Sequence, residues 1–213
     1  MLNIERFQCN PLAENCYVVS DSTLECVIID CGAYYEEERS VIVDYIRQNS
    51  LKPKHLLVTH AHADHNLGNN TIFDTFALRP ELSGRDEQLM TQIPEQAASF
   101  GFNVDYKLPA PDHFFDEKEV ITFGDHTFSI IETPGHSAGS VCFYCEEEKA
   151  LFTGDTLFRG SIGRTDFMGG SMFQIIQSLR CLCQLPDDVK VYPGHGGFTS
   201  IGNELASNPY LDR

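Results

Sequence analysis

The most informative stretch of the sequence is His60-Ala61-His62-Ala63-Asp64-His65, in which four of the six residues are of types that bind metals. It follows the segment 55–58, whose apolar residues are typical of a short buried strand. The first two histidines, at positions i and i+2, leave the end of a strand on the same side and can hold one ion. The aspartate and the last histidine then turn over the strand end toward a neighbouring position. Imidazole and carboxylate suit zinc, manganese or iron, and the lack of cysteine in the run disfavours a closed structural zinc site.

Three further residues of ligand type follow predicted strands. They are His136, Asp155 and His195, and each has a glycine directly before it. Taken singly, each is more simply an ordinary loop residue. Side chains at strand ends are held by the sheet yet face solvent, so separate strands can deliver them to one edge. Beside the histidine run, they favour a metal site built from distant parts of the chain.

Composition narrows the class of protein. The chain has 213 residues, 42% of them apolar, which suits one domain over residues 1–213 with a substantial core. With 15 Lys and Arg against 31 Asp and Glu, its formal charge is −16, so we expect no nucleic-acid partner. The opening residues lack the pattern of a secretion signal, and no apolar run approaches the roughly eighteen residues of a membrane span. We therefore expect a cytoplasmic protein with no membrane partner, and the sequence leaves its oligomeric state open.

The eight cysteines are expected to be free, buried thiols, because the chain shows no secretion signal. Two close pairs, Cys142/Cys145 and Cys181/Cys183, offer a structural zinc site as an alternative. The second pair lies at the end of a helical pattern, where positions i and i+2 point apart. Chelation by both thiolates would be awkward there, which disfavours the alternative.

Strand and helix patterns alternate along the chain without an internal repeat or a long linker. We predict helices over 36–48, 85–100 and 172–183, the last with Ser171 as N-cap and Gln174 reaching back to it. Pro53 is expected to stop the region of the first helix. The predicted strands lie within 15–30 (two strands), 55–58, 126–131, 140–145, 150–153 and 189–192. This order indicates a mixed α/β sandwich.

With these motifs the sequence resembles the metallo-β-lactamase-fold hydrolases. Within them it is most similar to the short glyoxalase II-like (hydroxyacylglutathione hydrolase-like) proteins that lack an extra C-terminal helical domain. The resemblance runs from Asn15-Cys16-Tyr17, through the histidine run, to Pro193-Gly194-His195. Two segments, 154–158 and 163–167, narrow it to the glyoxalase II-like and persulfide dioxygenase branch. The implied fold is an αβ/βα four-layer sandwich, with two sheets face to face and helices outside.

The resemblance also implies two divalent metal ions, with zinc as the first expectation and iron or manganese as alternatives. One metal would be held by His60, His62 and His136, and the second by Asp64, His65 and His195, with Asp155 bridging both. The implied reaction is hydrolysis of a small-molecule thioester or ester by a metal-bridging hydroxide, with Asp64 orienting the attacking water. Asp30 resembles a supporting carboxylate that orients a ligand, with a plain strand-terminating aspartate as an equal alternative.

Arg164 is the candidate contact to the substrate, because it resembles a basic residue with which the family often binds glutathione. Asp166 and Gly197, however, stand where the family has tyrosines. An ion pair between Arg164 and Asp166 that braces their loop is the alternative role. The resemblance therefore implies a thioester or ester but does not select its thiol or its acyl group.

Particular positions separate this chain from other branches of the same fold. His62 stands where flavodiiron-type oxygen reductases have a glutamate, and Asp155 where metallo-β-lactamases commonly have a cysteine. Oxygen reduction and lactam hydrolysis are therefore disfavoured. The nuclease branches usually carry a large inserted domain or an RNA-binding arm, for which this acidic chain has no room. The main alternatives are a mononuclear iron persulfide dioxygenase and a non-catalytic metal-binding scaffold.

Overall fold

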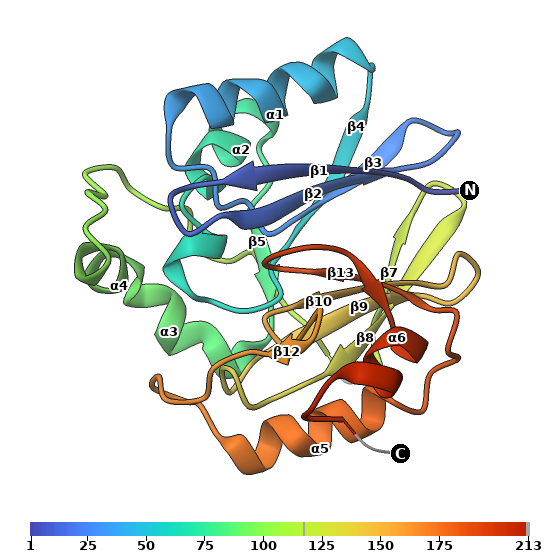
Figure 1. Ribbon diagram of the computed structural model, residues 1–213. Coiled ribbons are helices and arrows are strands. Elements are labelled where there is room, and N and C mark those ends of the chain that lie inside the picture. The colour runs from blue at the N-terminus through green and yellow to red at the C-terminus, as the bar shows by residue number, and fades with distance from the viewer. Residues whose placement is uncertain (117, 212–213) are drawn as a thin grey trace.

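Two six-stranded β-sheets lie face to face in the computed structural model, which describes residues 1–116 and 118–211 (Figure 1). The first sheet holds, in spatial order, β1 (Asn3–Cys9), β2 (Glu14–Ser20), β3 (Glu25–Ile29), β4 (Lys52–Leu57), β5 (Pro80–Leu82) and β6 (His113–Phe114). The second holds β14 (Thr199–Ser200), β13 (Lys190–Pro193), β10 (Ala150–Gly154), β9 (Val141–Cys145), β8 (His126–Glu132) and β7 (Val120–Phe123). A small hairpin is formed by β11 (Leu157–Phe158) and β12 (Ser161–Ile162).

The core between the sheets follows the two-residue period of their strands. In β2, Tyr17 and Val19 belong to the cluster between the two sheets, whereas Val18 packs on the other side with the helices. In β10, Phe152 lies between the sheets and Leu151 faces outward. Both faces of these strands are therefore apolar and buried, and helices must cover the outer ones.

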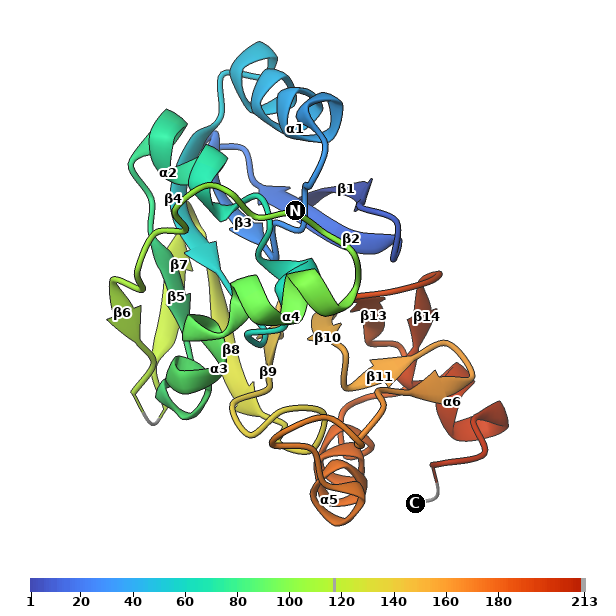
Figure 2. The same cartoon turned by 90° about the vertical axis from the view of Figure 1, so that its left-hand side faces the viewer.

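Helices cover the outer face of each sheet (Figure 1). The first sheet is covered by α1 (Glu36–Gln48) and α2 (Asn69–Phe76), and the second by α5 (Met172–Leu182) and α6 (Ile201–Ser207). In the turned view of Figure 2, α3 (Glu87–Thr91) and α4 (Ile93–Ser99) lie across the end of the molecule in front of the strands. Short 3₁₀ turns, η1 (Ala63–His65) and η2 (Gly84–Asp86), complete the elements. The predicted αβ/βα four-layer sandwich is confirmed.

Most of the predicted elements are confirmed, including the helix over 36–48 and the strands β8, β9, β10 and β13 of the second sheet. Ser171 caps α5 by accepting a hydrogen bond from the backbone N–H of Gln174, as predicted. The single helix over 85–100 is wrong: the chain breaks at Gln92, and Pro94, which has no N–H to donate, stands in the first turn of α4. Pro53 lies inside β4, where the pairing with β3 is irregular and tolerates it. The predicted strands do not include β1 or the shorter strands β5, β6, β7, β11, β12 and β14.

Cys9, Cys16, Cys26, Cys31, Cys142 and Cys145 are free, buried thiols, as expected, whereas Cys181 is free but exposed. Among the described residues, no helix combines the length and the apolar character needed to cross a bilayer. The buried thiols contribute to packing within this fold.

His126, at the start of β8, joins three segments of the chain. Its side chain is 7% exposed, with Nδ1 2.9 Å from Asp21 Oδ2 and Nε2 3.1 Å from Glu148 Oε1. The N-terminal ammonium of Met1 lies 2.9 Å from the same Glu148 oxygen. Burial lowers the pKa of His126, but its hydrogen bonds to the two carboxylates outweigh this and raise the pKa above 6.5. The protonated ring is therefore the form that the fold favours.

We expect His126→Gln to lower the free energy of unfolding by about 1.5–3 kcal/mol near pH 6, where the protonated ring bonds both carboxylates. A group whose pKa is raised on folding contributes fully below its unfolded pKa, and this contribution is lost as the pH rises through the folded pKa. The difference between the variant and the native protein should therefore shrink toward pH 9. Urea unfolding at constant ionic strength measures it.

The matched control is His113→Gln, because His113 pairs with Glu119 through a side chain that is 42% exposed. An exposed pair contributes less, so this variant should lose under about 1 kcal/mol. A loss at His126 that is the same at pH 6 and pH 9 would contradict the proposed charge pairing.

Candidate metal centre

The predicted ligands lie together at one end of the two sheets. The run from His60 to His65 follows β4 of the first sheet, and η1 forms its last turn. The second sheet supplies the others: His136 from the loop between β8 and β9, Asp155 directly after β10, and His195 after β13. Four segments far apart in the sequence thus bring seven side chains of ligand type to one place.

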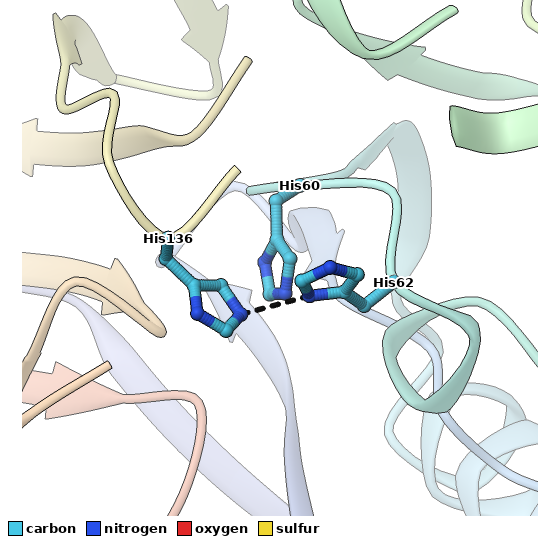
Figure 3. Close-up of side chains that lie close together, drawn as sticks. All are labelled: His60, His62 and His136. Atoms are coloured by element: carbon cyan, nitrogen blue, oxygen red, sulfur yellow. Dashed lines mark hydrogen bonds between the residues drawn. The ribbon is translucent and has the colours of Figure 1, made fainter. Parts of the chain in front are cut away.

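The first group of candidate ligands consists of three imidazoles, those of His60, His62 and His136. One ligand atom from each lies within 4.8 Å of the others, and all three residues are buried. Figure 3 shows the rings pointing toward one another, and Nδ1 of His62 lies 2.8 Å from Nε2 of His136. This set coincides with the one expected for the first metal.

The second group combines a carboxylate with two imidazoles, from Asp64, His65 and His195. Their ligand atoms also lie within 4.8 Å of one another. Asp64 Oδ2 is 3.4 Å from His195 Nε2 and 3.8 Å from His65 Nε2. A third group, Asp30 with His60 and His65, overlaps the other two. The second group coincides with the set expected for the second metal.

Asp155 lies between the two groups and reaches both with separate oxygens. Its Oδ1 is 2.9 Å from His195 Nδ1 and 3.4 Å from His65 Nε2. Its Oδ2 is 3.6 Å from His136 Nε2, on the side of the first group. A carboxylate in this position can contact two cations at once, which is the role that the resemblance implies for it.

Asp30 supports a histidine of each group. It accepts hydrogen bonds from Nδ1 of His65 at 3.0 Å and from the Thr59 hydroxyl at 2.7 Å. Because the Thr59 hydroxyl donates to Asp30, it accepts from Nδ1 of His60, which lies 3.0 Å away. Both rings are thereby turned so that Nε2 faces the site. These contacts agree with the supporting role that was one of the two alternatives for Asp30.

A backbone carbonyl orients the third imidazole of the first group. Nδ1 of His136 lies 2.7 Å from the carbonyl oxygen of Arg164. A carbonyl can only accept, so Nδ1 carries the hydrogen and a neutral ring presents its Nε2 lone pair to the site. The loop that contains Arg164 therefore helps to set the direction of a candidate ligand.

The two groups differ in the protonation of their rings. Burial, together with His136, lowers the pKa of His62 to about 3, and burial among neighbouring imidazoles lowers the pKa of His60 as well. Burial also acts to lower the pKa of His65 and His195, but carboxylates outweigh it. Asp155 and Asp64 raise the pKa of His65 well above its usual range, and Asp155 raises that of His195 to about 9. The second group thus balances its carboxylates with protons that a divalent cation would displace.

This set of donors fits divalent metal ions. The Nε2 atoms of His60 and His65 are buried and have no hydrogen-bond partner, which is rare in folded proteins and marks positions for a ligand. Imidazoles and carboxylates suit zinc, iron or manganese. None of the candidate groups formed by the described residues contains a cysteine, so the structure does not support the alternative zinc site at the paired cysteines.

Glycine is required at two positions that border the site. Gly154 has a φ of +46°, and a Cβ there would lie 2.3 Å from the Thr59 hydroxyl oxygen. At Gly194, a Cβ would lie 2.4 Å from Asp155 Oδ1 and 2.7 Å from Cε1 of His65. Only a residue without a side chain lets β10 and β13 approach the ligands this closely.

Asp86 fixes two ligand-bearing loops relative to each other. This residue was not among the predicted site residues. Its side chain is 1% exposed and accepts from the N–H of Ala61 at 3.0 Å, between the first two histidines of the run. It also accepts from the N–H of Gly139 at 2.6 Å and from the Ser137 hydroxyl at 2.7 Å, in the loop after His136. Because its partners lie 25 to 53 residues away, no short motif could have revealed it.

Gln96 of α4 holds the same loop from the other side and was also missed. Its Oε1 accepts from the N–H of Ala63 at 3.1 Å, and its Nε2 donates to the carbonyl of Ala61 at 3.3 Å. Nε2 also donates to the carbonyl of Leu89 at 2.9 Å, which ties the loop to α3. The helices at this end of the molecule therefore brace the histidine run.

A cavity of about 530 Å³ opens over the candidate ligands. Arg164 lines it, as a substrate contact would, yet its guanidinium is already engaged. Nε and Nη2 of Arg164 donate to the two oxygens of Asp166 at 2.7 and 2.6 Å, and the guanidinium lies 3.9 Å over the ring of Phe167. The ion pair that was the alternative role for Arg164 is therefore present.

We expect Asp86→Ala to weaken metal binding by about 10–100-fold, because the loops that carry the first ligand group lose their common anchor. The backbone N–H groups of Ala61 and Gly139, left without a partner, should each cost about 1–3 kcal/mol of stability unless water reaches them, whereas the Ser137 hydroxyl keeps its contact with Ser140. Metal titration of metal-free protein measures the first effect, and thermal unfolding measures the second. Glu87→Ala, one residue along on exposed surface, is the control. Native metal affinity in Asp86→Ala would show that the ligand groups do not depend on this anchor.

Comparison with known proteins agrees with this geometry. Residues 9–195 match the family model described as the metallo-beta-lactamase superfamily. The chain is 38% identical, over 99% of both chains, to the Haemophilus influenzae protein named hydroxyacylglutathione hydrolase GloC. It is also similar to the structure titled TTHA1623 in a di-iron-bound form (TM-score 0.87, 34% identity, covering 97% and 100% of the two chains) and to that titled BLEG-1 B3 metallo-beta-lactamase (TM-score 0.87, 33% identity, 99% of each). The chain therefore belongs to the metallo-β-lactamase superfamily.

Proposed function

We propose that this protein is a metal-dependent hydrolase that cleaves thioesters with two divalent cations. The observation that carries the proposal is the convergence of seven ligand-type side chains beneath one open cavity, among them two buried imidazole nitrogens without a hydrogen-bond partner. The ligands of the first cation are His60, His62 and His136. Those of the second are Asp64, His65 and His195, and Asp155 serves both.

The chemistry divides between the cations and the chain. The residues of the two groups would hold the cations, which when bound would lower the pKa of a bound water from 15.7 toward about 7 and polarise a substrate carbonyl. Burial acts to raise the pKa of Asp64, but His65 and the hydrogen bond with His195 lower it, so Asp64 is a carboxylate that can accept a proton from water. It also lines the cavity, where it can orient that water toward the substrate.

The thioester is the favoured substrate because of the relative from H. influenzae. That protein is named for a thioester reaction and aligns with this chain over almost its whole length. The similar structure titled as a di-iron form supports two metals of the same class. The similar structure titled as a B3 metallo-beta-lactamase favours a second candidate, lactam hydrolysis, although Asp155 stands where cysteine is common in that activity.

Metal content and a substrate panel test the proposal together. Purified protein should contain close to two transition-metal ions per chain by elemental analysis, and it should hydrolyse thioesters faster than a chromogenic cephalosporin. One iron per chain, with oxygen uptake in the presence of glutathione persulfide, would instead support the persulfide dioxygenase. Fully metallated protein that turns over no thioester, ester, lactam or persulfide would leave the metal-binding scaffold.

Replacing the shared carboxylate gives the sharpest single variant. Asp155→Ala should lower kcat/KM for a thioester by more than about 100-fold and reduce bound metal, because both groups lose a ligand while six others remain. Kinetics and elemental analysis on the same preparation measure both effects. The control is Asp188→Ala, since Asp188 is 61% exposed and pairs with Lys149 far from the site. If Asp155→Ala kept near-native turnover and metal content, Asp155 would not be a shared ligand.

A further inference from the structure

We propose that the cavity selects thioesters whose flanking groups are apolar and uncharged, and that it discriminates against anionic thiols such as glutathione. This inference rests on the proposed function and names the substrate class of the same site. It comes from the walls of the cavity rather than from the candidate ligands at its floor.

Apolar side chains form the walls, starting next to the ligands themselves. The ring of Phe167 lies 5.3 Å from that of His62, and the ring of Phe158 lies 6.1 Å from that of His195, measured between centroids. Aromatic rings therefore stand at both ends of the ligand cluster. Any group attached to the reacting carbonyl meets one of them, and burial of apolar surface there favours binding.

The apolar lining continues outward to the mouth of the cavity. Phe100, directly after α4, contacts Phe167 edge to face with centroids 6.3 Å apart. Leu12 and Leu89 also line the cavity, and so does Met168, which is 62% exposed. A substrate with an extended apolar group would cover these side chains, which otherwise face water.

The walls offer no free positive charge to an anionic group. Among the described residues, Arg164 is the one lysine or arginine that lines the cavity. Asp166 occupies the edge of its guanidinium through two hydrogen bonds, and Phe167 occupies its face. Because Asp166 already balances the charge of Arg164, a substrate carboxylate would gain only the guanidinium N–H groups that this ion pair leaves unbonded.

The other polar side chains of the walls are neutral or already bonded. Gln92, Ser99 and Ser161 carry no charge, and Gln96 is committed to the backbone of the histidine run. The formal charge of −16 on the whole chain also disfavours the approach of an anion over distances within the Debye length. Both the local walls and the long-range field thus favour a neutral substrate.

A panel with one acyl group and two thiols tests the inference. The hexanoyl thioester of N-acetylcysteamine is neutral, whereas that of glutathione carries two carboxylates. We expect kcat/KM for the neutral thioester to be at least about tenfold higher in the native protein. On the neutral thiol, hexanoyl should exceed acetyl by about tenfold or more, because the longer chain reaches the aromatic walls.

Two variants separate the charge from the apolar walls. Asp166→Asn frees the guanidinium of Arg164, so it should raise kcat/KM for hexanoyl-glutathione by about 3–10-fold relative to kcat/KM for the neutral thioester. Phe100→Ala should reduce the preference for hexanoyl over acetyl by about tenfold. The matched control is Phe173→Ala, because Phe173 is 75% exposed at the start of α5 and does not line the cavity.

Binding of inert analogues gives a readout that does not need turnover. S-hexyl-N-acetylcysteamine should bind more tightly than S-hexylglutathione in isothermal titration calorimetry. Thioester hydrolysis with a preference for the glutathione carrier, or an Asp166→Asn variant whose carrier preference is unchanged, would overturn the inference and leave the proposed function standing. Tighter binding of the neutral analogue by metal-loaded protein that cleaves no thioester would support the cavity's preference and overturn the hydrolase.

Discussion

The rest of the site depends on one electrostatic constraint: histidine rings and carboxylates are buried together and must compensate one another. Asp64, Asp155 and Asp30 each have a carboxylate oxygen within 3.8 Å of a ring nitrogen of His65, which is fully buried. Buried charges without partners are costly, so this arrangement persists only if positive charge is supplied. In the second group protons on His65 and His195 supply it, and bound cations would supply it more strongly.

Because of that constraint, many contacts of the surrounding fold fix the positions of the loops that carry the candidate ligands. A metal site needs its donors within a few tenths of an ångström, and loops alone do not provide this. The two sheets fix the starting points of the loops, and Asp86 and Gln96 then tie the histidine run to the neighbouring loop and helices. Because Gly194 has no Cβ, the backbone after β13 can lie against the Asp155 carboxylate; a Cβ there would be 2.4 Å from Asp155 Oδ1.

Short-range signals in the sequence account for the parts that could be predicted. Apolar runs ending in a ligand-type residue predicted both the strands and the edge where His136, Asp155 and His195 meet the histidine run. Asp86 and Gln96 could not be found in this way, because each acts through backbone atoms of segments remote in sequence. Their segment is predicted as one continuous helix, and the break at Gln92 shows that the local signal of Pro94, which has no N–H to donate, outweighs the helical pattern around it.

The contacts of Arg164 show why a sequence motif shared with a family does not by itself identify the substrate. The same loop uses the Arg164 carbonyl to orient His136 and the Arg164 side chain to bond Asp166. The first contact serves any reaction that needs the imidazole, and the second decides whether a cation faces the cavity. A change at position 166 can therefore alter the charge offered to a substrate while the ligand set stays intact. Within this loop, the Arg164 carbonyl orients a candidate metal ligand, and the Arg164 side chain with Asp166 sets the charge that the loop presents to the cavity.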